Sequence, residues 1–320
     1  MPPLPLSDSL RATLAYYDSL GYPLTLLELS RYCVFYNTPT TISEMQEALD
    51  TLVEKEQIQS HVGMYALTKV QEKVETRLKR NTITIRKWKR ARRAARLIGH
   101  IPFVRMVTVC NDVALSFAHE ESDIDLFIVS APHRLWWVRF WSASIMQVLG
   151  LRPARGRMRD SICLSLYASE DALSLERYIL PGSDRVDIHF IQWLSHFYPL
   201  YDTGGVYEAF FKENTWLEKV IPLRLSVITH PYRDVYISWL ASVVRKIAEW
   251  IFGGVLGDGA QYILKRLQLA LLPDVLGERM NKDTSVVITD TGMKFHPRDN
   301  RAAKRDAWYE TLYAMGIFQK

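Results

Sequence analysis

The chain has 320 residues, of which 48% are hydrophobic and 12% aromatic, a composition that supports folded cores and excludes a disordered or fibrous protein. The longest stretch without Asp, Glu, Lys or Arg is the fourteen residues of 188–201, shorter than the roughly 20 apolar residues of a membrane-spanning helix. The first eight residues lack the basic segment and apolar core of a signal peptide, so no membrane association and a cytoplasmic location are expected. The three cysteines (Cys33, Cys110 and Cys163) suit reduced thiols rather than a disulfide framework.

Three helices and a hairpin are predicted near the start of the chain. Apolar residues recur at helical spacing over 9–20, and a second short helix begins at Thr25. A third helix is expected to begin at Ser43, whose hydroxyl would cap it while Gln46 reaches back. Alternating residues on either side of a Val-Gly pair predict a hairpin over 58–67.

This order of elements resembles a winged helix-turn-helix module, in which 43–55 would take the place of the recognition helix. The exposed face of that helix is predicted to be acidic and would repel DNA phosphates. Its acidic residues are Glu44, Glu47, Asp50, Glu54 and Glu56. Two interpretations therefore remain: contact with nucleic acid assisted by a neighbouring basic segment, or a packing and protein-contact role.

Positive charge is concentrated in the segment that follows. The net formal charge is +5, but residues 69–96 contain twelve Lys or Arg against Glu72 and Glu75, which gives this segment +10 and the other 292 residues −5. Such a block attracts phosphates through its summed field and through counterion release. The 69–96 segment is a candidate contact for nucleic acid, and the alternative is a solvated helix between two domains.

Within this segment, 82–99 is predicted as an amphipathic helix. Its expected inward stripe is Ile85, Trp88, Ala91, Ala95 and Ile98. The basic residues placed elsewhere around the helix are Lys87, Lys89, Arg90, Arg93 and Arg96. Pro102 ends the helix, and the alternation over 103–110 predicts a strand.

A pair of carboxylates is the one motif with evident chemistry. Residues 122–129 are predicted as a strand, whose period of two places Asp123 and Asp125 on the same face. Neighbouring carboxylates repel, and hard oxygen ligands at this spacing suit Mg²⁺ or Mn²⁺ with bridged phosphates, as in nucleotidyl transfer. The alternative is a strand that starts at the surface with two solvated aspartates.

The context of the pair resembles the DNA polymerase β-like nucleotidyltransferase superfamily, most closely its bacterial members with an amino-terminal winged helix. A strand ending at Cys110, a turn, a short helical run over 113–117 and the strand S-D-I-D-L-F-I-V follow in the same order. The resemblance covers 80–215 well and the rest loosely. It implies an NTP as substrate and Mg²⁺ or Mn²⁺ as cofactor. The residues it implies are Asp123 and Asp125 as catalytic metal ligands, and Asn111, Asp112 and Ser122 as nucleotide-binding positions.

Two departures from the family pattern bear on activity. The family turn is Gly-Ser, whereas this chain has Asn111 and Asp112. Asn tolerates a positive φ, but Asp112 replaces a phosphate donor with an anion. The third carboxylate of active members is also missing, since Ser165 stands at its expected place on the predicted strand 162–167. Asp160 and Asp187 could substitute only where the fold brings them near.

These departures leave three functions open. The first is a metal-dependent nucleotidyltransferase that moves an NMP from an NTP to an unidentified acceptor. The second is a catalytically degenerate nucleotidyltransferase-like protein that binds nucleic acid or has a regulatory role. The third is a protein-interaction scaffold that binds neither ligand.

Other candidates have weaker signals. Arginines in the loop 152–159 could grip phosphates or form a solvated turn, and two histidines are interpreted as packed rather than metal-binding. Amphipathic helices over 237–251 and 263–271 are interpreted as a helical cap or a dimer surface. The residues concerned are Arg152, Arg155, Arg157, Arg159, His189 and His196.

Together the patterns predict an α+β chain in three parts. Residues 1–69 form a winged-helix-like module, 70–218 a nucleotidyltransferase-like mixed sheet with flanking helices and a basic lead-in helix, and 219–320 a mostly helical carboxy-terminal region. The oligomeric state is left open.

Overall fold

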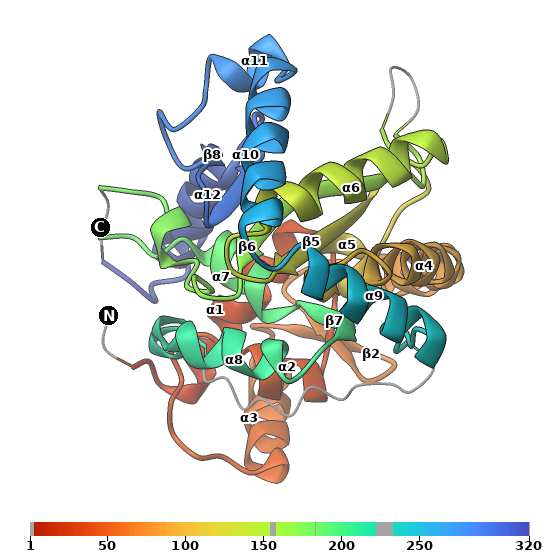
Figure 1. Cartoon of the computed structure of the whole chain (residues 1–320). Helices are drawn as coiled ribbons and strands as arrows, with labels where there is room; N and C mark the ends of the chain where they lie inside the picture. Colours follow the sequence, from red (N-terminus) through yellow and green to blue (C-terminus); the bar gives the residue numbers. More distant parts are fainter. Residues whose placement is uncertain (1–2, 154–157, 183, 222–232, 320) are drawn as a thin grey trace.

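The computed structural model describes residues 3–153, 158–182, 184–221 and 233–319. It contains a three-stranded sheet in the order β1-β3-β2 and a six-stranded sheet in the order β7-β4-β5-β6-β9-β8, with helices around both (Figure 1). The predicted mixture of α and β structure is confirmed. None of the helices within these ranges combines the length and apolarity needed to cross a bilayer.

The N-terminal elements follow the predicted order of three helices and a hairpin, with β1 as an additional short strand. They are α1 (Leu6–Ser19), β1 (Leu24–Thr25), α2 (Leu26–Tyr32), α3 (Ile42–Glu54), β2 (Gln59–His61) and β3 (Met64–Ala66). Thr25 and Glu28 form a reciprocal capping box that starts α2. The predicted cap of the third helix at Ser43 is wrong, because Thr41 and Glu44 form the same reciprocal box and α3 has already begun at Ile42.

The basic helix α4 (Val70–Gly99) begins earlier than predicted. Two placements on it are wrong. Lys87 is fully buried, and its ammonium group donates to Asp160 at 2.7 Å and to the Ser122 carbonyl at 2.6 Å. Ile85, predicted to face inward, is 50% exposed. Lys87 therefore lies in the stripe of α4 that packs on the sheet, because Asp160 compensates its buried charge.

The central sheet has one parallel pair. Its strands are β4 (Val104–Val109), β5 (Ile124–Ser130), β6 (Ile162–Ser169), β7 (Tyr198–Asp202), β8 (Val286–Ile288) and β9 (Gly292–Phe295). β5 and β6 are parallel and are joined through α6 (Leu135–Val148), whereas the other neighbours are antiparallel. β8 and β9 come from the region predicted as mostly helical, and β9 pairs with β6, so the carboxy-terminal part of the chain completes this sheet.

A bulge in β6 changes which side chains share a face. The register with β5 shifts between Asp125 and Phe127. Leu164 consequently packs in the core on one face of the sheet, while Leu166 packs in the core on the other. The predicted regular alternation over 162–167 is therefore wrong, because the bulge adds one residue to β6.

Two apolar cores flank the central sheet. One contains Phe127 and Val129 and is shared with the N-terminal helices and with later helices of the chain. The other contains Ile124, Leu126 and Ile128 and is covered by α4 and α6. The remaining helices are α5 (Asn111–Ala114), α7 (Ile188–Ser195), α8 (Val206–Glu213), α9 (Trp239–Ile251), α10 (Val255–Ala270), α11 (Asp274–Gly277) and α12 (Arg301–Ala314), with 3₁₀ turns at Glu176–Tyr178 and Thr215–Lys219.

Candidate functional site

The predicted carboxylate pair lies where β5 begins. Asp125 is in β5, Asp123 directly precedes it, and Cys163 is the partner of Asp125 on the parallel strand β6. The potential ligand atoms of these three residues lie within 4.8 Å of one another, and all three are partly exposed. The two aspartates are thus brought together as predicted.

The turn after β4 holds Asp125 in position. Asn111 has a φ of 53°, so the tolerance of asparagine for positive φ predicted from the sequence is used here. Its amide donates to Asp125 Oδ2 at 2.6 Å, and the Ser165 hydroxyl donates to Asp125 Oδ1 at 3.4 Å. Ser165, which occupies the position predicted for a third acid, therefore helps to orient Asp125.

The site disfavours two negative charges in the absence of a cation. Burial raises the pKa of Asp125 to about 7, and the charge of Asp123 adds to this effect, although the Asn111 hydrogen bond opposes it. Burial also raises the pKa of Asp123. A bound cation would offset both the burial and the repulsion.

The donor set fits a hard divalent cation. Asp123 and Asp125 offer carboxylate oxygens, the ligands that Mg²⁺ and Mn²⁺ prefer. Burial raises the pKa of the Cys163 thiol well above its ordinary value, so a neutral sulfur borders the pair. The two aspartates are therefore the residues that could hold such an ion, and Cys163 lines the site as a neutral neighbour.

The other predicted nucleotide-binding residues lie close to the pair in different settings. Asp112 is 47% exposed at its side chain and lies 4.0 Å from His119. Burial raises its pKa, while the positive charges of Arg80 and Lys304 oppose this effect. The Ser122 hydroxyl donates to the His119 carbonyl at 2.8 Å, which fixes the loop that leads into β5.

Neither alternative third acid joins the pair. Asp160 lies 2.7 Å from Lys87, and Asp187 caps α7 and lies 2.8 Å from Arg301. Among the described residues, only Asp123, Asp125 and Cys163 form a group of this kind around the site. Both alternative acids are held by buried cations, so the fold uses them for structure.

A small basic cavity adjoins the pair and was not assigned from the sequence. Its volume is about 90 Å³, and Asn111, which binds Asp125, is part of its wall. The rest of the wall comes from α7, β9, the segment after β9 and the start of α12: His189, Phe190, Trp193, Lys294, His296, Arg298, Asp299, Asn300 and Arg301. Lys294 and Arg301 bind Asp299, whereas Arg298 is exposed. The sequence signal was the run F-H-P-R-D at 295–299, whose position beside Asn111 depends on the pairing of β9 with β6.

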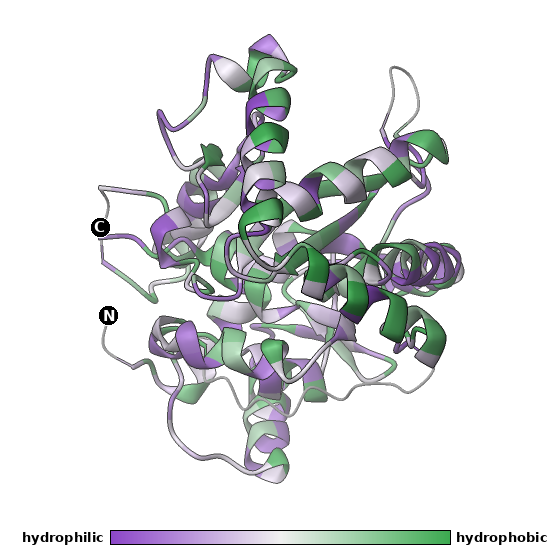
Figure 2. Ribbon diagram, in the orientation of Figure 1, coloured by the Kyte–Doolittle hydropathy of each residue, from purple (hydrophilic) through white to green (hydrophobic). Residues whose placement is uncertain are grey.

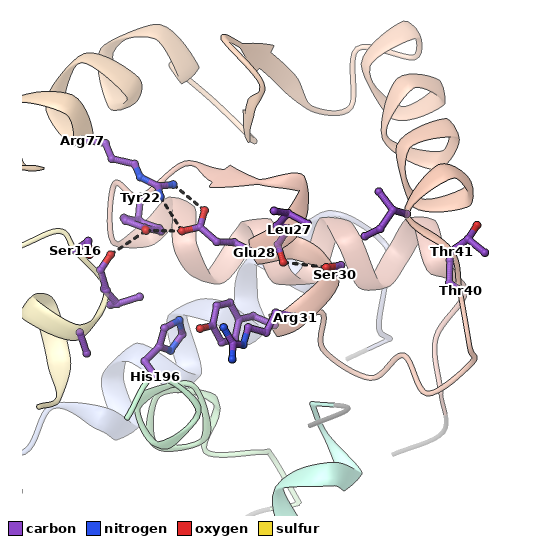
Figure 3. A pocket seen from close by; sticks show the side chains of 14 residues that line it. Tyr22, Leu27, Glu28, Ser30, Arg31, Thr40, Thr41, Arg77, Ser116 and His196 are labelled. Atoms are coloured by element: carbon purple, nitrogen blue, oxygen red, sulfur yellow. Dashed lines mark hydrogen bonds and ion pairs between the residues drawn. The ribbon is translucent and has the colours of Figure 1, made fainter. Parts of the chain in front are cut away.

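A larger pocket of about 580 Å³ lies between α2, α3 and α5 (Figure 3). Its polar groups largely bind one another: Arg77 binds Glu28 at 2.7 and 2.8 Å, and the Tyr22 hydroxyl lies 2.8 Å from Glu28. His196 stacks on Tyr32 with ring centroids 4.0 Å apart, and burial lowers its pKa to about 4, so it is a neutral, packed histidine. The pocket therefore lies at the contact between the N-terminal elements and the rest of the chain.

Of the remaining candidates that the structure describes, Arg159 and His189 bind residues other than the pair. Of the loop arginines, Arg155 and Arg157 lie outside the described residues, and Arg159 pairs with Glu120. His189 contacts the Tyr16 hydroxyl at 2.7 Å, and burial lowers its pKa to about 3.

Comparison of the chain with protein-family models, with curated proteins and with solved structures finds no match.

Proposed function

We propose that this chain is a metal-dependent nucleotidyltransferase of the DNA polymerase β-like type, which moves an NMP from an NTP to an acceptor. The observation that carries the proposal is the geometry of Asp123 and Asp125. They lie together at the start of β5, beside a turn whose Asn111 adopts positive φ and binds Asp125. The order β4, turn, α5, β5 supports the same assignment.

Each residue near the pair has a distinct role in this proposal. Asp123 and Asp125 hold the divalent cation, which supplies neutralisation of the attacked phosphate when bound. Asn111 and Ser165 keep the Asp125 carboxylate oriented toward it. Exposed Arg298 places positive charge near the site for the phosphates.

A thermal-shift titration with each NTP, with and without Mg²⁺ or Mn²⁺, tests the proposal. A nucleotide at 100 times its dissociation constant is expected to stabilise the chain by about 2.7 kcal/mol. The shift should require the metal and should disappear in Asp123→Ala. Asp112→Ser should bind the NTP more tightly, because it replaces an anion with a phosphate donor.

Asp50→Ala on α3 serves as the matched control, since Asp50 is an exposed acid of the N-terminal module. Its shift should equal that of the unaltered chain. A chain that responds to no nucleotide, or an Asp123→Ala variant that responds as strongly as the original, rules out the proposed site.

A specific feature of α4 favours nucleic-acid binding as a second function. Lys89, Arg93 and Arg96 are exposed at helical spacing, and within the described ranges they form no ion pair. The arrangement of α1 to α3 with the β1-β3-β2 sheet supports a winged-helix module, but α3 presents exposed acids, so α4 would make the phosphate contacts. Lys87 is excluded because it is buried.

Changing these three residues to alanine should weaken binding to duplex DNA and reduce the slope of log affinity against log salt by about 2.7 in magnitude. Binding is measured by fluorescence anisotropy over a range of salt concentrations, with Lys282→Ala as the control. Absent binding, or a slope that the triple variant leaves unchanged, argues against this second function.

A further inference from the structure

Helix α9 docks on the protein through its charged side. Glu249 accepts from the Phe103 backbone amide at 2.6 Å and from the Arg105 guanidinium at 3.0 and 3.1 Å. Arg245 donates to the Gly99 carbonyl at 3.3 Å and also binds the Tyr201 hydroxyl. Although burial alone would raise the pKa of Glu249, the hydrogen bonds from Arg105 and Phe103 lower it below its ordinary value. The carboxylate that anchors α9 is therefore ionised at neutral pH.

The apolar side of α9 faces outward. A surface helix normally turns its apolar stripe toward the core and its charges toward water, and α9 does the reverse. Trp239 is 77% exposed and Trp250 is 84% exposed. No large apolar residue of this helix is fully buried.

Helix α10 also exposes large apolar residues, although part of its apolar side faces inward. Leu264 and Leu269 pack, partly buried, against the core that α6 covers. Two amide side chains also bind α6: Gln261 accepts from the Trp137 amide at 2.9 Å, and Gln268 donates to the Trp136 carbonyl at 2.9 Å. Leu256, Ile263 and Leu267 of α10 are exposed and continue the apolar surface of α9. Figure 2 shows hydrophobic residues in green along both helices. We call this surface the α9–α11 face. Its exposed large apolar residues are Tyr236, Trp239, Leu240, Val243, Val244, Ile247, Trp250, Ile251, Val255, Leu256, Tyr262, Ile263, Leu267, Leu271 and Val275.

The size of the α9–α11 face exceeds what a monomer ordinarily exposes. Aromatic side chains present on the order of 150–250 Å² each, so its two tryptophans and two tyrosines, 63–84% exposed, alone expose roughly 600 Å². The largest apolar patch of a monomeric protein is typically about 300–600 Å². With its eleven aliphatic residues, the face reaches the ~800 Å² that each partner of a stable interface buries.

The charge of the α9–α11 face distinguishes between two partners that could cover it, an anionic lipid bilayer and a second copy of the chain. The exposed ionisable residues from Trp239 to Met280 are Lys246, Asp258, Arg266, Asp274, Glu278 and Arg279, three basic and three acidic. A face without net charge gains nothing from an anionic bilayer, whose attraction depends on clustered Lys and Arg. It also does not repel an identical face, and two-fold dimers are the commonest oligomers. We propose that the α9–α11 face is the interface with a second copy of this chain.

Sedimentation velocity of the full chain over a wide concentration range tests this interface. The unaltered chain should sediment as a dimer. Ile247→Glu and Ile263→Glu should each weaken dimerisation about a hundredfold or more, because an unpaired carboxylate would be buried between the copies. Both positions are exposed in the single chain, so the far-ultraviolet circular dichroism of the variants should be unchanged.

Val62→Glu is the matched control, since Val62 is a 74% exposed apolar residue on the β2–β3 turn, outside the face. It should dimerise like the unaltered chain. A parallel flotation assay uses vesicles of phosphatidylcholine with and without phosphatidylserine. A chain that is monomeric at every concentration, dimerisation that survives both substitutions, or vesicle binding by a monomeric chain would each overturn the proposal.

Discussion

Asp125→Asn is expected to stabilise the metal-free chain at pH 8 by an amount on the order of a few kcal/mol, and to weaken its Mg²⁺-dependent nucleotide binding about a hundredfold or more. The new amide can accept the Asn111 hydrogen bond and donate to the Ser165 hydroxyl, so both contacts of the carboxylate are kept. The substitution removes only the buried charge. Without the cation this charge destabilises the folded chain, and with the cation it is a metal ligand.

The pH dependence of this effect follows from the raised pKa of Asp125. In the folded, metal-free chain its pKa is about 7, above its ordinary value of 3.8. Between these values the folded state keeps a proton that the unfolded chain has released, so the free energy of unfolding falls as the pH rises through this window. The variant lacks this loss, and the two proteins should therefore differ little at pH 4 and most at pH 8.

Thermal unfolding of both proteins in chelator, at several pH values and then with Mg²⁺, measures these differences. Mg²⁺ should stabilise the original chain and leave the variant unchanged. Asp50→Asn is the control, because Asp50 is an exposed acid of α3 and its substitution should change metal-free stability little. A variant that is less stable than the original at every pH would mean that the Asp125 charge serves the fold.

Arg301→Ala is expected to destabilise the chain by about 3–5 kcal/mol. Arg301 lies 2.8 Å from both Asp187 and Asp299 and also donates to the Tyr178 carbonyl at 2.9 Å. Asp187 is only 1% exposed, so removing the guanidinium would leave its charge buried without a cationic partner. Urea unfolding followed by tryptophan fluorescence measures the change.

Two further variants identify the cause of that loss. Arg298→Ala, three residues earlier and exposed, should change stability by no more than about 0.5 kcal/mol. Asp187→Asn combined with Arg301→Ala should recover part of the loss, because the unpaired charge is then absent. If the double variant is no more stable than Arg301→Ala alone, the buried charge of Asp187 is not what makes the substitution costly.

Local patterns predicted much of the secondary structure because they depend on short-range physics. The helical periodicity of α1 and α4, the start of α2 at Thr25 and the strand over 104–109 were all readable from spacing. The third helix cap was misplaced by two residues, because both Thr41 and Ser43 are good caps and only the reciprocal bonds with Glu44 distinguish them.

Contacts between distant residues could not be predicted in this way. The burial of Lys87 depends on Asp160, 73 residues away. The strand β9 finds its place only through pairing with β6, and that pairing places residues 294–301 beside Asn111. Asp187 was a candidate third acid in the sequence, but in the fold it caps α7 and forms an ion pair with Arg301.

The α+β class, the tolerance of Asn111 for positive φ and the proximity of Asp123 to Asp125 could be predicted from the sequence, because strand period and backbone preference act over a few residues. Which acids are held by buried cations, and that the apolar side of α9 faces solvent, depend on contacts between distant parts of the chain. An amphipathic pattern states that a helix has two faces, and the partners available in three dimensions decide which of them turns inward.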